Sequence, residues 1–234
     1  MAKFGFSTGA IAYSDFNKAL DILREFNFTA IELSALREPE LPVLIAALSR
    51  LDLGSFEYIS FHAPSSIDPR HENEVVGMLM TIVERGWPVI VHPDVIHTPE
   101  MWRSFGPYLL IENMDKRKPI GRTEAELHYL FNEFPDALMC FDIGHARQVD
   151  PTMTVASSIL RRFKSKIKQL HVSEVDTQSK HRPLTEASRL AFAAISELVP
   201  SDIAVIIEST GLEPSSLAKE IAYASQSLFE NQLA

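Results

Sequence analysis

The segment ALMCFDIGHA, residues 137–146, decides the fold. Its first five residues are apolar and lead to Asp142, and a short Ile143-Gly144 turn then precedes His145. An apolar run without alternation is typical of a strand in a parallel sheet whose outer face is covered by helices. The order of this segment, with an apolar run, a polar loop and an amphipathic helical stretch, recurs along the whole sequence.

Eight such runs alternate with about eight helical stretches, and this predicts an α/β fold, a closed (β/α)8 TIM barrel, as a single domain over residues 1–234. A doubly wound open sheet is the alternative, but it requires a glycine-rich loop after the first strand, and Phe6–Ala10 contains one glycine. The runs are Lys3–Ser7, Thr29–Leu33, Tyr58–His62, Val89–His92, Tyr108–Glu112, Ala137–Asp142, Lys168–Val172 and Ala204–Glu208.

Helix-start signals support this alternation. We expect Ser14 to precede one helix and Thr98-Pro99 to open a helix of only a turn or two. Thr123 and Glu126 have the spacing of a capping box, and Thr185 is placed to open a later helix.

Composition limits the class of protein. The 234 residues include 22 Lys and Arg against 31 Asp and Glu, a net charge of −9, with 46% hydrophobic and 23% charged residues. These are globular values, and the longest apolar runs, such as Leu41–Leu48, are too short to span a bilayer. One cysteine, Cys140, allows no internal disulfide, so we expect a cytoplasmic protein with no membrane partner.

Polar residues end most of the predicted strands. In a barrel these ends open onto one face, where active sites lie. Two further histidines follow in the loops after the sixth and seventh strands. The residues are Ser7, Glu32, His62, His92, Glu112, Asp142, His171 and Glu208 at the strand ends, with His145 and His181 in the loops.

Imidazoles and carboxylates in this number would repel or desolvate one another unless a cation neutralised the carboxylates. The mixture suits Zn²⁺, Mn²⁺ or Fe²⁺, so we expect divalent metal ions as cofactors. In the order of the strands around the barrel, Glu112 lies between the His62/His92 pair and the group Asp142/His171/Glu208. A carboxylate there can bridge two ions, which predicts a site that is at least dinuclear.

The motifs that carry these residues resemble the xylose isomerase-like barrel superfamily, which includes endonuclease IV and the sugar isomerases and epimerases. Their order and spacing cover strands three to eight. They are Phe61-His62-Ala63-Pro64, Val91-His92-Pro93, Ile111-Glu112-Asn113, Phe141–Ala146, Leu170-His171-Val172 and Ile207-Glu208-Ser209.

Resemblance to endonuclease IV implies three ion sites. His62, His92 and Glu112 would hold the first ion; Glu112, Asp142, His171 and Glu208 would hold the second. His145 and His181 would help to hold a third. That family has an acidic ligand where this sequence has Ser179, and a serine hydroxyl is a poor substitute. Two ions are therefore expected.

Resemblance to the sugar epimerases implies one metal on Glu112, Asp142, His171 and Glu208. The two glutamates would then double as catalytic acid and base. His145 and Arg182 would hold substrate oxygens, and His145 is also expected to take part in catalysis.

Other charged residues are candidates for substrate binding. Glu32 either binds substrate or points into a wet barrel mouth, and Arg147, Lys180 and Arg182 either hold a phosphate or are solvated loop charges. Four more cations, Arg70, Arg117, Lys118 and Arg122, form a potential basic rim. We expect Cys140 and Trp102 to be packing residues.

The first expectation for function is a metal-dependent isomerase or epimerase of a small sugar or sugar phosphate. The alternative is a Zn-dependent phosphoester hydrolase like endonuclease IV, which the extra histidines favour. A non-catalytic metal-binding or sugar-binding barrel is a minor alternative. The acidic charge and short loops disfavour a nucleic-acid partner without forbidding one, and a homo-oligomer stays open.

Overall fold

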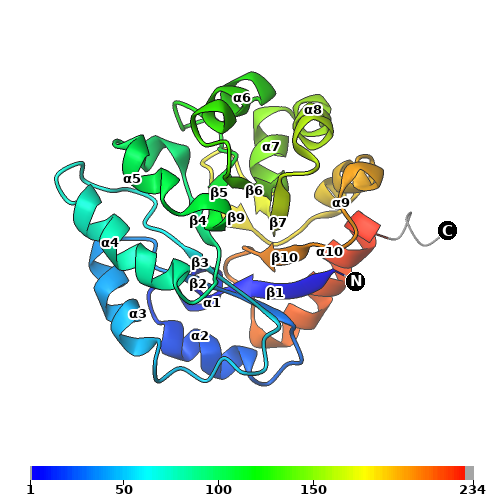
Figure 1. Cartoon of the computed structure of the whole chain (residues 1–234). Coiled ribbons are helices and arrows are strands. Elements are labelled where there is room, and N and C mark those ends of the chain that lie inside the picture. The colour runs from blue at the N-terminus through cyan, green and yellow to red at the C-terminus, as the bar shows by residue number, and fades with distance from the viewer. Residues whose placement is uncertain (1, 230–234) are drawn as a thin grey trace.

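Eight parallel strands close into a barrel in the part of the chain, residues 2–229, that the computed structural model describes (Figure 1). The hydrogen-bonded order is β1-β10-β7-β6-β5-β4-β3-β2, so β1 pairs with both β2 and β10. The barrel strands are β1 (Lys3–Ser7), β2 (Ala30–Ser34), β3 (Tyr58–His62), β4 (Val89–Val91), β5 (Leu109–Glu112), β6 (Leu138–Asp142), β7 (Ile167–Val172) and β10 (Ala204–Ile207).

Helices surround this barrel on its outside (Figure 1), as the apolar, non-alternating strands require. The predicted (β/α)8 TIM barrel is confirmed. The helices are α1 (Thr8–Ala12), α2 (Phe16–Leu23), α3 (Leu41–Ala47), α4 (Glu72–Val83), α5 (Pro99–Arg103), α6 (Glu124–Glu133), α7 (Ile143–Val149), α8 (Thr154–Phe163), α9 (Glu186–Ala193) and α10 (Leu217–Phe229).

The predicted strand bounds hold to within one residue at each end. Two runs, Lys3–Ser7 and Tyr58–His62, match their strands. His92 and Glu208 lie just beyond β4 and β10, because the chain leaves the sheet at these positions. An extra antiparallel hairpin, β8 (Glu174–Val175) with β9 (His181–Arg182), follows β7 and was not predicted.

One helix start is as expected, and another is wrong in detail. Ser14 precedes α2, and the side chain that caps this helix is that of Asp15, whose carboxylate accepts a hydrogen bond from the Lys18 N–H at 3.0 Å. At α6 the Thr123 hydroxyl accepts from the Glu126 N–H at 3.3 Å as expected. The Glu126 carboxylate, however, accepts from the Arg122 N–H at 2.7 Å and does not complete a capping box.

Two other starts are confirmed. The helix that begins at Pro99 is short and ends at Arg103. At α9, Thr185 and Ser188 form a reciprocal capping box.

The barrel interior positions the site through side-chain alternation. Ile90, Leu110 and Cys140 form a small buried cluster apart from the main core, which lies between strands and helices. Side chains two residues apart on a strand share a face. The next interior positions are therefore His92, Glu112 and Asp142. The barrel interior is thus apolar in its lower part and polar at the carboxyl ends of the strands.

Three single residues show how tightly the barrel and its helices are packed. A Cβ on Gly5 would lie 1.7 Å from the Ala30 carbonyl oxygen, so β1 and β2 approach each other only because this residue is glycine. Trp102 is fully buried and donates from Nε1 to Glu72 Oε1 at 2.9 Å, which confirms its packing role. Cys140 is likewise buried, as expected.

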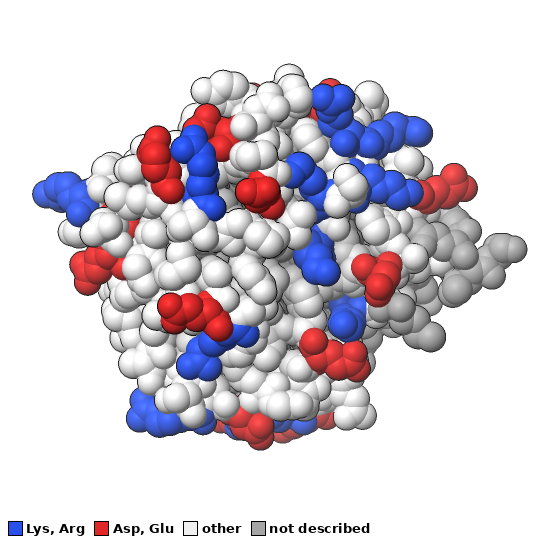
Figure 2. All heavy atoms as spheres, viewed as in Figure 1, with Lys and Arg blue, Asp and Glu red and all other residues white. Residues whose placement is uncertain are grey.

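The exterior carries charges of both signs. Figure 2 shows acidic and basic side chains interspersed over the visible face. Over residues 2–229, none of the helices is both long and apolar enough to cross a membrane.

Candidate metal centre

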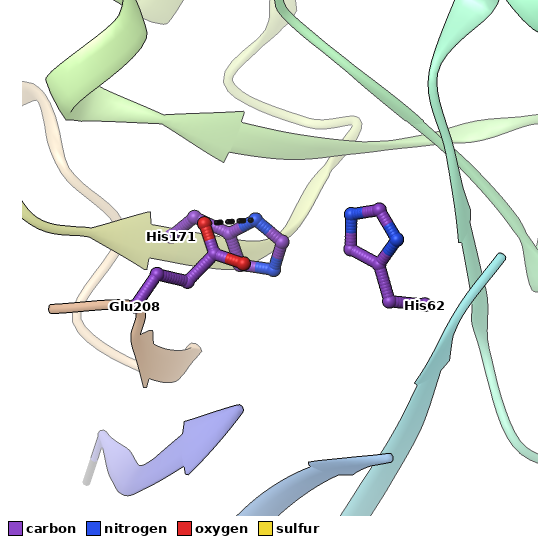
Figure 3. A group of neighbouring side chains, drawn as sticks. All are labelled: His62, His171 and Glu208. Carbon is purple, nitrogen blue, oxygen red and sulfur yellow. Dashed lines mark ion pairs between the residues drawn. The ribbon is translucent and has the colours of Figure 1, made fainter. Parts of the chain in front are cut away.

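The carboxyl ends of the strands bring together overlapping groups of potential ligands. Within each group the ligand atoms lie within 4.8 Å of one another. Figure 3 shows His62 facing His171 and Glu208 from the opposite side of the barrel. Within residues 2–229 the groups are His62/His92/Glu112, Glu112/Asp142/His171/Glu208, Asp142/His145/His181 and His62/His171/Glu208.

Glu112 presents its two carboxylate oxygens to different groups. Oε2 lies 3.2 Å from His62 Nε2 and 3.4 Å from His92 Nε2. Oε1 lies 3.3 Å from His171 Nδ1 and 3.4 Å from His145 Nδ1. The Glu112 side chain is 1% exposed, so it lies buried between the His62/His92 pair and the His171/His145 pair. This is the arrangement of a carboxylate that could bridge two ions.

Asp142 has an oxygen suited to a cation. Oδ1 accepts a hydrogen bond from the His145 N–H at 2.7 Å and caps α7. Oδ2 is buried and has no hydrogen-bond partner within residues 2–229, and its ion-pair contact, His145 Nδ1, lies 3.4 Å away. The Asn113 side chain holds the Asp142 backbone through two hydrogen bonds of 2.8 Å. A buried carboxylate oxygen without a donor is costly, and a divalent cation would offset that cost. The donor set therefore fits a metal.

The turn after Asp142 depends on Gly144. A Cβ at this position would lie 2.5 Å from the Ser173 carbonyl oxygen. Glycine therefore lets α7 approach the chain that follows β7, and the first turn of α7 then delivers His145 to the ring.

The pKa values of the candidate ligands show that positive charge stabilises this group of side chains. Burial opposes ionisation of Glu112, yet His171, His62 and His92 outweigh it and hold the pKa of this carboxyl well below its usual value. Burial also disfavours the charged form of His62, but a hydrogen bond to Glu112 and the charge of Glu32 raise the pKa of its imidazole to about 9. Burial raises the pKa of Glu208 to about 8. Protons thus neutralise the carboxylates where a cation would otherwise do so.

His181 lies in the β8–β9 hairpin, and its side chain reaches the other candidate ligands. Its ring centroid lies 5.3 Å from that of His145, and Nδ1 lies 2.8 Å from Ser173 Oγ. Burial and the nearby His145 lower the pKa of His181 to about 3, so it is a neutral ring available as a ligand. Ser179 donates its hydroxyl proton to Asp115 Oδ1 at 2.7 Å.

A cavity of about 400 Å³ opens over these groups. Six candidate ligands line it, whereas Asp142 and His171 are fully buried beneath. Its other walls carry small residues from the end of β1 and from α1, and two cations from the loop after β5. These wall residues include Ser7, Gly9, Ala10, Tyr13, Leu36, Ser65, Asp115, Arg117, Lys118, Ser179 and Thr210.

The three residues predicted to bind substrate do not line this cavity. Glu32 is fully buried, which is inconsistent with a charge in a wet barrel mouth. Arg147 pairs with Glu174, and Arg182 Nε lies 3.0 Å from Asp176 Oδ2. Local acidic partners hold both arginines outside the cavity wall, and spacing in the sequence could not reveal these partners.

Of the four cations predicted to form a basic rim, two line the cavity. Arg117 and Lys118 line the cavity, and Lys118 Nζ lies 2.7 Å from Asp94 Oδ2. Arg117 Nε lies 3.5 Å from Asp115 Oδ1. Arg70 and Arg122 also pair with neighbouring carboxylates but do not line the cavity. Sequence analysis did not identify Asp115 or Tyr13 as site residues. Tyr13 is 68% exposed with a φ of 55°, and no local signal marks it.

Comparisons with known proteins place the fold. No protein-family model matches the sequence, and no curated protein matches it either. Endonuclease IV from Thermus thermophilus is similar in structure, with 17% identity, a TM-score of 0.62 and coverage of 96% of this chain and 99% of that one.

Two further solved structures are similar. The 3-keto-D-glucoside 4-epimerase from E. coli shows 12% identity and a TM-score of 0.60, with 95% and 98% of the two chains covered. A xylose isomerase-like TIM barrel protein from Mycobacterium smegmatis, in complex with magnesium, shows 15% identity and a TM-score of 0.59, with 93% and 89% covered. The protein therefore shares the barrel fold of endonuclease IV and the sugar epimerases, as its motifs predicted.

Proposed function

We propose that this protein is a divalent-metal-dependent enzyme that hydrolyses a phosphoester of a small, sugar-type molecule. The observation that carries the proposal is the position of Glu112, whose two oxygens face different histidines: Oε2 faces His62 and His92, and Oε1 faces His171. Two ions joined by one carboxylate are the usual arrangement for attack on a phosphoester.

The metal ions would be held by the groups that share Glu112. One ion fits His62, His92 and Glu112, and a second fits Glu112, Asp142, His171 and Glu208. The mixture of imidazole and carboxylate ligands favours Zn²⁺ or Mn²⁺, with Fe²⁺ as a further choice. When bound, such ions supply positive charge that lowers the pKa of water and stabilises charge on phosphoryl oxygens.

The protein's own residues would orient the substrate. Arg117 and Lys118 line one side of the cavity and offer cationic donors to a phosphate. Asp94 and the Ser65 carbonyl oxygen, at 2.7 and 3.3 Å, hold the Lys118 ammonium in place. Tyr13 offers an aromatic ring at the cavity edge.

The size of the cavity supports a small substrate. About 400 Å³ lies in the range of small-molecule sites. Endonuclease IV is named for a nucleic-acid substrate and 3-keto-D-glucoside 4-epimerase for a sugar derivative, so the shared fold is compatible with either class. The cavity and the net charge of −9 favour the small molecule.

Isomerase or epimerase chemistry is the second candidate, and sequence analysis ranked it first. The group Glu112, Asp142, His171 and Glu208 favours it, because one metal and two glutamates suffice to move a proton next to a substrate carbonyl. His62 and His92 favour the first candidate. Their Nε2 atoms face Oε2 of Glu112, whereas His171 faces Oε1, and single-metal chemistry does not require them.

A parallel assay separates these functions. Metal-loaded protein would be tested on sugar phosphates, on an abasic-site oligonucleotide and on ketose sugars. Release of phosphate that is abolished by both His92→Ala and Glu112→Gln would support the proposal. Epimerisation that survives His92→Ala would establish the second candidate. Metal binding without any turnover would indicate the non-catalytic binding barrel, and cleavage of the oligonucleotide would replace the small-molecule substrate.

A further inference from the structure

Glu32 is a buried carboxylate directly behind the candidate ligand His171. Its Oε2 lies 2.9 Å from His171 Nε2, and both side chains are 0% exposed. The other ring nitrogen of His171, Nδ1, lies 3.3 Å from Glu112 Oε1 and 3.4 Å from Glu208 Oε2. The imidazole therefore has one nitrogen in the ligand ring and the other against Glu32.

Neighbouring strands fix the position of Glu32. Gln169 Nε2 on β7 donates to Glu32 Oε2 at 2.7 Å and lies 2.8 Å from His171 Nε2, and Tyr58 Oη on β3 donates to Gln169 Oε1 at 3.0 Å. Ser60 Oγ, beside Glu32 in the β2–β3 register, lies 3.5 Å from the same Oε2. The contacts converge on the one oxygen that faces His171.

Within residues 2–229, Glu32 forms no ion pair with a lysine or an arginine. For the described part of the chain, residues 2–229, its ion-pair partner is His171 and Oε1 has no hydrogen-bond partner. An isolated buried carboxylate is costly unless a charged or strong donor faces it. The Nε2–H of His171 is such a donor, so Glu32 and His171 stabilise each other.

The contact with Glu32 favours one nitrogen of His171 as the atom that would bind a cation. When Nδ1 gives its lone pair to a metal, the ring proton lies on Nε2. That proton then points at Glu32 Oε2, 2.9 Å away. A carboxylate in this position fixes the tautomer and the orientation of the ring and increases its basicity as a ligand.

We propose that Glu32 is a positioning residue that selects Nδ1 of His171 as the metal-binding atom and strengthens the His171–metal bond. The inference rests on the metal site of the proposed function. It assigns to Glu32 a role behind the ligands, in place of the substrate contact expected from the sequence.

The test measures metal affinity and not turnover. Zn²⁺ dissociation constants would be obtained by competition with a chromophoric chelator for the wild type, Glu32→Gln and Glu32→Leu. Glu72→Gln is the matched control, because Glu72 is also buried and accepts hydrogen bonds from Trp102 and Thr98 outside the site. Loss of a carboxylate behind a histidine ligand weakens metal binding by roughly 10- to 100-fold.

We expect Glu32→Leu to weaken Zn²⁺ binding by about tenfold or more, with a smaller loss in Glu32→Gln and none in Glu72→Gln. Less than about a threefold loss in Glu32→Leu, or an equal loss in Glu72→Gln, would overturn the inference.

A second measurement reads the tautomer in the wild type and uses a variant only to assign the signal. NMR of ¹⁵N-histidine-labelled, Zn²⁺-loaded protein would report the tautomer of His171, assigned with a His171→Asn sample. A protonated Nε2 supports the proposal, and a metal-bound Nε2 refutes it. If the wild type binds no metal, the proposed function fails first and this inference falls with it, whereas normal wild-type binding with normal binding by Glu32→Leu refutes the inference alone.

Discussion

His62 Nε2 lies 3.2 Å from Glu112 Oε2, although the two residues are 50 positions apart in the sequence. They come from β3 and β5, two strands on either side of β4 in the barrel. The same carboxylate contacts His171 through its other oxygen at 3.3 Å. Glu112 is therefore the residue through which the two main ligand groups are coupled.

The first prediction concerns metal content. Protein purified without chelator should hold about two Zn²⁺ or Mn²⁺ ions per chain by elemental analysis. Glu112→Gln should lower this to about one ion or fewer, because it removes a bridging oxygen from both groups. His181→Ala should have a smaller effect, because that residue belongs to neither group that contains Glu112. Full occupancy in Glu112→Gln would contradict the bridging role.

The second prediction concerns the pH dependence of the chelator-treated protein. The pKa of His62 in the fold is about 9 against an ordinary value of 6.5, so protonation of His62 stabilises the fold. This contribution is fully present below pH 6.5 and is lost as the pH rises through about 9. The Tm of metal-free protein should therefore fall across this interval. His62→Gln should flatten the decline, and an identical decline in that variant would contradict the assignment.

The third prediction concerns two arginines that sequence analysis could not distinguish. Arg117 lines the cavity, whereas Arg182 is held by Asp176 away from it. Arg117→Ala should raise KM for a phosphorylated substrate about tenfold, the effect of losing one charged hydrogen bond. Arg182→Ala should leave KM nearly unchanged and is the matched control. Equal effects in steady-state kinetics would show that the cavity wall does not select the phosphate.

The fourth prediction concerns the barrel closure between β1 and β2. Gly5→Ala should destabilise the protein by at least about 1–3 kcal/mol, because its Cβ would meet the Ala30 carbonyl oxygen. Gly77→Ala is the control. Gly77 is exposed within α4 with no atom within 4 Å of an added Cβ. That change should stabilise the protein by about 0.5–1 kcal/mol. Denaturant unfolding would measure both, and an unchanged midpoint in Gly5→Ala would contradict the close approach.

The sequence by itself determined the barrel, its strands to within a residue and the face on which candidate ligands gather. It could do so because apolar runs, helix starts and polar strand ends are local patterns, and because parallel strands in a barrel all present their carboxyl ends on one side. His62, Glu112 and His171 could therefore be grouped from the sequence alone. The expected barrel is the one that the structure contains.

Only the tertiary structure decided which charged residues face the cavity and which are paired elsewhere. Glu32 and Arg182 both lie beside candidate ligands in the predicted order, yet one is buried behind His171 and the other is held by Asp176. Arg117 does not lie beside a candidate ligand in the sequence, yet it lines the cavity. The direction of a long side chain depends on partners from other strands and loops, and such contacts form only when the barrel closes.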